Sequence, residues 1–302
     1  MLFFAFVFGW NNSGLTTGNL SNLVSYNLSL FLTLSGILTG LLVTGQTMSS
    51  SILGKLISKS LPTPELFSAI VVSVAMLLVL TLLKLPVSLS NCTVGAFLGA
   101  ALASGTEIKI SSLIEIVGSW MVIPFACAFL SFLIYEITIR VEQSHSLVSV
   151  VRANRLVLAI VVFLVSFMLG ANNLGVIQSL ASVSAKNSMT LDIFELLLFG
   201  AAATGIVLFG KNLAKVVSDK IVGLSQIKTF SAMLAATFVI MVLTVLSIPV
   251  SLTQVIIGGM LGAGVSRRPW AVNTREIVIL ISGWTLVTIG CTVFGFALSR
   301  FL

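Results

Sequence analysis

The chain reads FGWNNSG at residues 8–14 and LGANNLG at residues 169–175, and this recurrence decides the fold. In both places two adjacent asparagines stand beside glycine, within or at the end of a long apolar run. Asn11 and Asn172 are 161 positions apart in a chain of 302 residues. A motif that recurs at such a distance indicates an internal duplication.

Two further landmarks recur in the same order. The stretch LPVSLSN at 85–91 corresponds to IPVSLTQ at 248–254, and both continue into glycine-spaced segments. Trp120, in a Gly-Ser-Trp sequence, corresponds to Trp284 in Ser-Gly-Trp, 164 residues later. Three matched landmarks in one order are hard to obtain by chance, so the sequence predicts two homologous halves.

Composition places the chain in a membrane. Hydrophobic residues make up 57% of it and charged residues 8%, and its mean hydropathy is +1.16. Soluble proteins carry roughly 25% charged residues, so this chain has too few polar side chains to cover a water-facing surface. The apolar runs are long and lack the alternation of barrel strands. We predict an all-α polytopic membrane protein, because a backbone in lipid must satisfy its own hydrogen bonds.

Each half is expected to hold five hydrophobic segments. They are 1–22, 28–48, 66–84, 86–104 and 112–139 in the first half, and 156–184, 191–210, 229–248, 250–265 and 276–300 in the second. We assign residues 1–140 to a first transmembrane repeat, 141–155 to a basic linker and 156–302 to a second repeat. An odd number of spans per half inverts one repeat relative to the other, as in many transporters. Segments 86–104 and 250–265 are short and could instead be re-entrant.

Basic residues indicate an orientation. If all ten segments span, 11 of the 16 Lys and Arg residues fall on one face and 5 on the other. The face with more Lys and Arg should be cytoplasmic. We therefore predict a multi-pass protein of the cell membrane with both termini outside the cell. The net charge of +7 is explained by these basic loops, and no nucleic-acid partner is expected.

Two kinds of polar element lie at membrane depth, where polar groups are costly unless they line a cavity or pair with one another. Asn-Asn beside glycine is a poor helix former, so each pair is expected to interrupt its helix and expose amide groups. Each Pro-Val-Ser element should begin a helix, and free N–H groups at a helix start attract anions. A capping or packing role was the alternative for each element. Together they predict a site for a small inorganic anion.

These paired elements resemble the inorganic phosphate transporter family, which also includes sulfate permeases. That family repeats Gly-Ala-Asn-Asp-Val-Ala-Asn, and Pro-Val-Ser-Thr-Thr ending in His or Gln, once per half. The resemblance covers essentially the whole chain, and residues 249–254 differ from the second motif only at Leu252. It implies an ion-coupled symporter, usually driven by Na⁺ or H⁺, with substrate held between two halves that have broken helices and half-helix hairpins.

The resemblance and the polar elements together give the predicted substrate site. Its residues are Asn11, Asn12, Ser88, Ser90, Asn91, Asn172, Asn173, Ser251, Thr253 and Gln254. Asn12 and Asn173 stand where the family has aspartate. They could still bind Na⁺ through their carbonyl oxygens, but they cannot titrate. Leu89 and Leu252 replace hydroxyl residues of the family pattern.

We therefore predict a secondary active permease for inorganic phosphate, cation-coupled and working by alternating access. A permease for sulfate or another oxyanion, and a passive anion channel or facilitator, are the alternatives. No enzyme is expected, because no zinc-protease motif or Ser–His arrangement is present. No cofactor is expected beyond a coupling ion, Na⁺ or H⁺, and a homo-oligomer is left open. Glu195 lies near a segment end, where a solvated or interfacial role is expected.

Overall fold

The protein is almost entirely helical. A computed structural model describes residues 1–13, 17, 24–57, 61–83, 88–144, 147–182, 188–221, 225–245, 251–266 and 274–302. The first half holds α1 (Leu2–Ser13), α2 (Tyr26–Leu56), α3 (Thr63–Leu82), α4 (Leu89–Ser104) and α5 (Ile110–Ser144). The second holds α6 (Leu147–Leu169), the π-helical turn η2 (Gly170–Leu174), α7 (Gly175–Ser182), α8 (Ser188–Ile221), α9 (Gln226–Val245), α10 (Leu252–Val265) and α11 (Thr274–Phe301). Within the described residues the β-structure amounts to one isolated bridge, between Ile57 and Ile108.

Among the described residues, six helical stretches are long and apolar enough to cross a bilayer. They are Tyr26–Thr44, Thr63–Leu82, Ile110–Val141, Leu156–Gln178, Ile227–Thr244 and Ile281–Phe301. Large apolar side chains on their outer faces are exposed, including Phe125 on α5 and Leu286 on α11. Such faces are stable only against lipid. The prediction of an all-α polytopic membrane protein is confirmed.

The helices α4 and α10 are too short to cross the membrane. With 16 and 14 residues, they are about 24 and 21 Å long at 1.5 Å per residue. The hydrocarbon core measures about 30 Å. Most residues of both helices are buried, because α4 packs against α3 and α11 while α10 packs against α9 and α5. These lengths favour the re-entrant alternative for both segments.

The stretch predicted to be a basic linker, 141–155, is mostly helical. α5 continues to Ser144 and α6 begins at Leu147, and residues 145 and 146 lie outside the described part of the chain. The local composition is polar and basic, which is typical of a loop. A long helix that projects beyond the lipid has the same composition, because its ends face water.

Glycines allow helices of the two halves to approach closely. On α4, Gly99 lies against the carbonyl oxygen of Thr292 in α11; on α10, Gly262 lies against that of Ala128 in α5. A Cβ atom on either glycine would overlap that oxygen. Gly99 and Gly262 are 163 residues apart, and Ala128 and Thr292 are 164 apart. The same contact therefore occurs twice, with the roles of the two halves exchanged.

A second exchanged contact involves the helices that carry the asparagine pairs. Gly9 of α1 lies against Ala202 of α8, and Gly170 of η2 lies against Ile37 of α2. The residues are again related by about the repeat spacing: the two glycines are 161 positions apart, and Ile37 and Ala202 are 165 positions apart. The short helices and the asparagine helices of each half thus pack on the other half.

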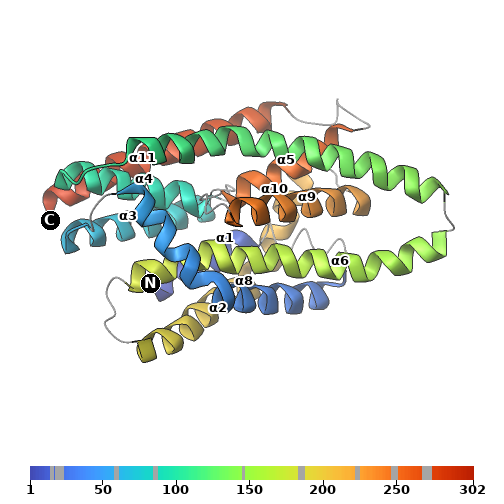
Figure 1. Cartoon of the computed structure of the whole chain (residues 1–302), viewed down its shortest axis with the longest axis horizontal. Helices are drawn as coiled ribbons and strands as arrows, with labels where there is room; N and C mark the ends of the chain where they lie inside the picture. The colour runs from blue at the N-terminus through green and yellow to red at the C-terminus, as the bar shows by residue number, and fades with distance from the viewer. Residues whose placement is uncertain are drawn as a thin grey trace.

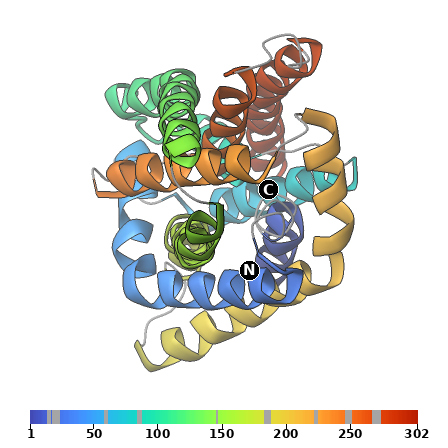
Figure 2. The same cartoon turned by 90° about the vertical axis from the view of Figure 1, so that its right-hand side faces the viewer.

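The equivalent helices α5 and α11 run in opposite directions. α5 leads to the end of the molecule where it meets α6, and α11 ends at the C-terminus, at the opposite end (Figure 1). Viewed along the long axis, α5 and α11 stand on one side of the protein, and α2 and α8 lie on the other (Figure 2).

Candidate functional site

The first asparagine pair lies in the last turn of α1. The Nδ2 atom of Asn11 donates a hydrogen bond to Oγ1 of Thr81, near the end of α3, at 2.8 Å. The Nδ2 atom of Asn12 donates to the carbonyl oxygen of Phe8 at 3.1 Å. Both asparagines are buried. The predicted interruption is not found at the pair itself, because the chain is α-helical through Ser13; residues 14–16 lie outside the described part.

The second asparagine pair lies in a widened turn. Asn172 and Asn173 belong to η2, whose flanking residues Leu169 and Gly175 have ordinary right-handed helical dihedral angles. The helix therefore changes pitch for one turn and continues into α7, as π-helical turns at functional sites commonly do. The Nδ2 atom of Asn172 lies 3.5 Å from Oγ1 of Thr244, near the end of α9. This is the counterpart of the Asn11–Thr81 bond.

The serines cap the two short helices. Ser88 precedes α4, and its Oγ accepts a hydrogen bond from the backbone N–H of Ser90 at 3.2 Å. Ser251 precedes α10, and its Oγ accepts from the N–H of Gln254 at 3.3 Å. The prolines were expected within the first helical turn; they precede the caps and lie outside the described residues. Serine caps a helix better than proline does, because the serine hydroxyl accepts a hydrogen bond from a backbone N–H that has no partner within the helix.

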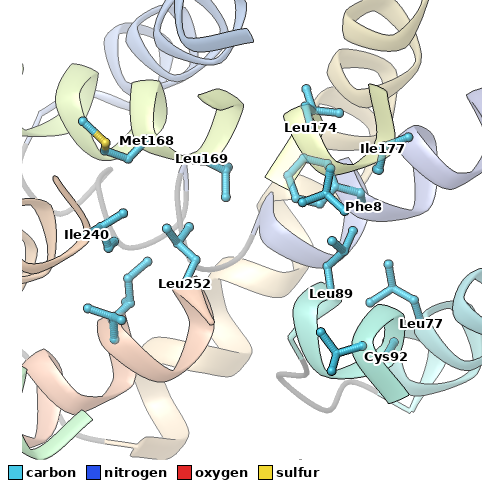
Figure 3. Close-up of a cluster of buried hydrophobic side chains, with 14 of the residues drawn as sticks. Phe8, Leu77, Leu89, Cys92, Met168, Leu169, Leu174, Ile177, Ile240 and Leu252 are labelled. Atoms are coloured by element: carbon cyan, nitrogen blue, oxygen red, sulfur yellow. The ribbon is translucent and has the colours of Figure 1, made fainter. Parts of the chain in front are cut away.

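Helix starts and asparagine helices lie next to each other in both halves. Leu89, the first residue of α4, points toward Phe8 of α1, and Leu252, the first residue of α10, points toward Leu169 (Figure 3). Thr81 and Thr244, which hold the asparagines, end the helices that precede α4 and α10. Leu89 and Leu252 are the positions where the family pattern has hydroxyls. Here both leucines are buried in the apolar cluster.

Within the predicted site, five buried amide oxygens accept no hydrogen bond from any described residue. They belong to Asn11, Asn91, Asn172, Asn173 and Gln254. A buried acceptor without a donor lowers the stability of the fold by about 1–3 kcal/mol. Several such acceptors close together therefore indicate a site for a ligand that binds to them. Hard cations prefer oxygen ligands, and a hydroxyl group on a substrate could also donate to these atoms. All five residues belong to the predicted site.

Asn91 and Gln254 come from different halves of the chain. Both line a cavity of about 670 Å³, with Trp120 and Trp284 among its other walls. The Nδ2 atom of Asn91 donates to the carbonyl oxygen of Trp284 at 3.3 Å. The remaining walls come from α5, α10 and α11 and are chiefly apolar. An anion would not leave water for such apolar walls, so the candidate site consists of the helix starts, to which Asn91 and Gln254 belong, and excludes the rest of the cavity.

Sequence reasoning missed Thr81 and Thr244. A signal was available, because each threonine stands five residues before the proline of its Pro-Val-Ser element. The prediction for Glu195 was wrong, because this carboxyl group is only 4% exposed and accepts a hydrogen bond from Nε2 of Gln178. Ser90 and Thr253 are buried at the starts of α4 and α10, as expected for the predicted site.

The chain is similar in structure and in sequence to known transport proteins. A solved structure titled "The sodium-dependent phosphate transporter" superposes with a TM-score of 0.79, covering 99% of this chain and 96% of that one at 16% identity. From Bacillus subtilis, a "Probable low-affinity inorganic phosphate transporter" is 25% identical over 230 residues, 73% of this chain and 69% of the relative. "Sulfate permease CysP" from the same organism is 24% identical over 259 residues, 83% of this chain and 70% of that protein.

The fold is that of a polytopic helical membrane protein. Residues 15–295 match the phosphate transporter family. The chain belongs to this family, as the Asn-Asn and Pro-Val-Ser elements implied.

Proposed function

We propose that this protein is a cation-coupled permease for inorganic phosphate that works by alternating access. The observation that carries the proposal is the pairing of two serine-capped helix starts with two buried asparagine pairs, one of each per half. The Asn11–Thr81 and Asn172–Thr244 hydrogen bonds join each asparagine pair to the helix that precedes a serine-capped helix start. Family membership supports the substrate class.

The anion would be held by the starts of α4 and α10. Helix N-termini carry partial positive charge and open N–H groups. Ser88 and Ser251 use their oxygens as acceptors for the helix, so their hydroxyl hydrogens remain for a ligand. Ser90 and Thr253 add hydroxyls. The described residues of these two helix starts are serine, leucine, threonine, asparagine and glutamine. The anion would therefore be bound by helix and side-chain dipoles and not by a lysine or arginine.

The unpaired amide oxygens favour phosphate over sulfate. Phosphate near neutral pH still carries a hydroxyl group and can donate to an acceptor, whereas sulfate is fully ionised and cannot. The oxygens of Asn91 and Gln254 are buried acceptors without a described donor. A site that hydrogen-bonds a substrate hydroxyl discriminates strongly against an analogue that lacks it. Relationship to a sulfate permease keeps sulfate, or another oxyanion, as the second candidate.

A coupling cation would bind at the asparagine pairs. We assign Na⁺ to the side-chain oxygens of Asn12 and Asn173, the positions at which the family has aspartate. The unpaired oxygens of Asn11 and Asn173 fit a hard cation. The sodium dependence named for the structural neighbour agrees with this assignment.

Alternating access is supported by the exchanged contacts between the halves. Equivalent glycines meet equivalent backbones, and α5 and α11 run in opposite directions (Figure 1). An inverted repeat explains both observations. Inverted repeats give inward-facing and outward-facing states of similar energy by exchanging the conformations of the two halves.

Uptake by proteoliposomes tests the proposal. Labelled phosphate and labelled sulfate are compared under an imposed Na⁺ gradient, a pH gradient and neither. We expect saturable phosphate uptake that a gradient accelerates and that excess sulfate inhibits weakly. Q254L should reduce the preference for phosphate, whereas S119A, a part-buried position of α5 outside the predicted site, should not. Electrical recording distinguishes a channel, which passes ions far faster than a carrier. Folded protein that takes up neither anion would refute the proposal.

A further inference from the structure

The cavity of about 670 Å³ beside the helix starts is too apolar for an anion and is left unused by the proposed site. Its volume lies within the range of about 300–1,000 Å³ that is typical of small-molecule sites. None of its described wall residues is an Asp, Glu, Lys, Arg or His. A charged ligand would lose its hydration here without gaining a counter-charge. The cavity therefore suits an uncharged ligand.

The outer walls of the cavity are formed by lipid-facing side chains. Met121 and Phe125 of α5 and Ile289 of α11 line the cavity, and each is more than half exposed. Both helices hold a candidate membrane span, and both stand on the same side of the protein (Figure 2). A ligand would therefore enter the cavity from the bilayer and not from water.

The cavity follows α10 along most of its length. The α10 residues that line it run from Gln254 at the start of the helix to Val265 at its end. This stretch measures roughly 16 Å at 1.5 Å per residue. The hydrocarbon of one leaflet is about as thick, at half of about 30 Å. Ile257 and Leu261 lie between the two ends, so an extended alkyl chain would contact apolar side chains along this wall.

Three hydrogen-bonding atoms of the wall residues have no partner among the described residues. They are the donor Nε1 of Trp120 and the acceptors Oδ1 of Asn91 and Oε1 of Gln254. All three side chains are at least nine-tenths buried. A pure hydrocarbon would leave these atoms unpaired, which is unfavourable. A hydroxyl group both donates and accepts, so a head group with two hydroxyls can pair with two acceptors and one donor.

We propose that this cavity binds a neutral single-chain lipid with a hydroxyl-bearing head group, such as a monoalkylglycerol. The alkyl chain lies along α10, and the hydroxyl groups bind Trp120, Asn91 and Gln254. Because Asn91 and Gln254 also belong to the proposed anion site, the lipid and phosphate compete for their amide oxygens. This competition rests on the proposed function, whereas binding of the lipid does not.

A second copy of the chain is a different occupant for the same face. The exposed side chains that line the cavity are chiefly apolar. The same face of another copy would therefore bring mainly hydrocarbon to Trp120, Asn91 and Gln254, and their buried polar atoms would stay unpaired. The unpaired atoms favour the lipid.

Photolabelling of the full chain in liposomes tests the binding. The probe is a hexadecyl monoether of glycerol with a diazirine in its alkyl chain, and mass spectrometry locates the labelled residues. The competitors, at equal mole fraction in the membrane, are the unmodified monoether, the same compound with both hydroxyls methylated, and hexadecane. The methylated compound keeps the chain and the oxygens but cannot donate a hydrogen bond.

We expect labelled residues on the cavity walls of α5, α10 and α11. The unmodified monoether should displace the probe at a concentration roughly tenfold lower than the methylated compound does, because two donated hydrogen bonds are lost. Hexadecane should compete less than either. Equal displacement by all three compounds, or label spread evenly over the other lipid-facing helices, overturns the proposal.

Variants of the cavity walls locate the bound lipid. W120F keeps an aromatic ring and removes the indole N–H, so the affinity should fall roughly two- to tenfold. T285W should prevent labelling, because Thr285 lines the cavity and a larger side chain fills it. T204W, at an exposed threonine of α8 outside the cavity walls, should label as wild type does. Unchanged labelling of W120F and T285W, or crosslinks that join two copies through α5 and α11, overturns the proposal.

Uptake of labelled phosphate tests the competition. The monoether should raise the KM for phosphate and leave the maximal rate unchanged, and W120F should need more of it for the same effect. A fall in maximal rate that is equal in wild type and W120F would reflect a general change of the bilayer and overturns the competition. If the probe labels the cavity as expected but no phosphate enters, the proposed function fails and the lipid site stands.

Discussion

Replacing Thr81 with valine tests whether the end of α3 holds the first asparagine pair in position. Thr81 Oγ1 lies 2.8 Å from Nδ2 of Asn11, and both side chains are buried. Valine keeps the shape of threonine and removes the acceptor. The N–H of Asn11 is then left buried without a partner, which costs about 1–3 kcal/mol. T244V should cost less, because the Asn172–Thr244 separation is 3.5 Å, at the limit of a hydrogen bond.

A double-mutant cycle isolates this interaction. The free energy of unfolding is measured by denaturant titration in detergent for wild type, T81V, N11L and the double variant. A buried hydrogen bond predicts a coupling energy of about 1 kcal/mol between the two sites. Phosphate uptake by the same proteins should fall in T81V more than in T244V. A coupling energy near zero, or equal losses in T81V and T244V, would show that the bond does not position Asn11.

Gly262→Leu should severely reduce the yield of monodisperse protein in size-exclusion chromatography, because any Cβ at this glycine overlaps the backbone of α5. Gly118→Leu should be tolerated, because nothing lies within 4 Å of a Cβ at that position. Ser88→Ala and Ser251→Ala should each lower the free energy of unfolding by about 0.5–2 kcal/mol and raise the KM for phosphate, since a cap and a ligand donor are lost together; Ser119→Ala, with no cap to lose, should change neither. The cysteines should resist maleimide until the protein unfolds, because all are buried, and labelling of folded protein detected by mass spectrometry would contradict their placement. They are Cys92, Cys127 and Cys291.

Much of the fold could be predicted because its determinants are local or repeated. Apolar runs identify the spanning helices, and the matched landmarks predict two homologous halves. The extent of α5 and α6 could not be read from the sequence, since a water-facing helix and a loop share the composition of residues 141–155. The re-entrant alternative was visible in the sequence because two segments are short, and the lengths of α4 and α10 in the structure favour it.

The candidate site was predictable at the level of motifs and not of contacts. The asparagines and serines stand out because polar residues are rare in these segments. Thr81 and Thr244 do not, since threonine in a membrane helix usually bonds to its own backbone; their roles depend on tertiary packing with Asn11 and Asn172. Glu195 was misjudged because sequence distance from a segment end does not reveal what covers a side chain.

The packing of α4 on α11, and of α10 on α5, means that the two halves of the sequence are not two separate bodies. Two separate bodies could rock one against the other. In this protein the short buried helix of each half packs on a long helix of the other half, so any rigid group that moves must combine segments from both halves. Neither half could be removed or replaced without taking away part of the packing of the other.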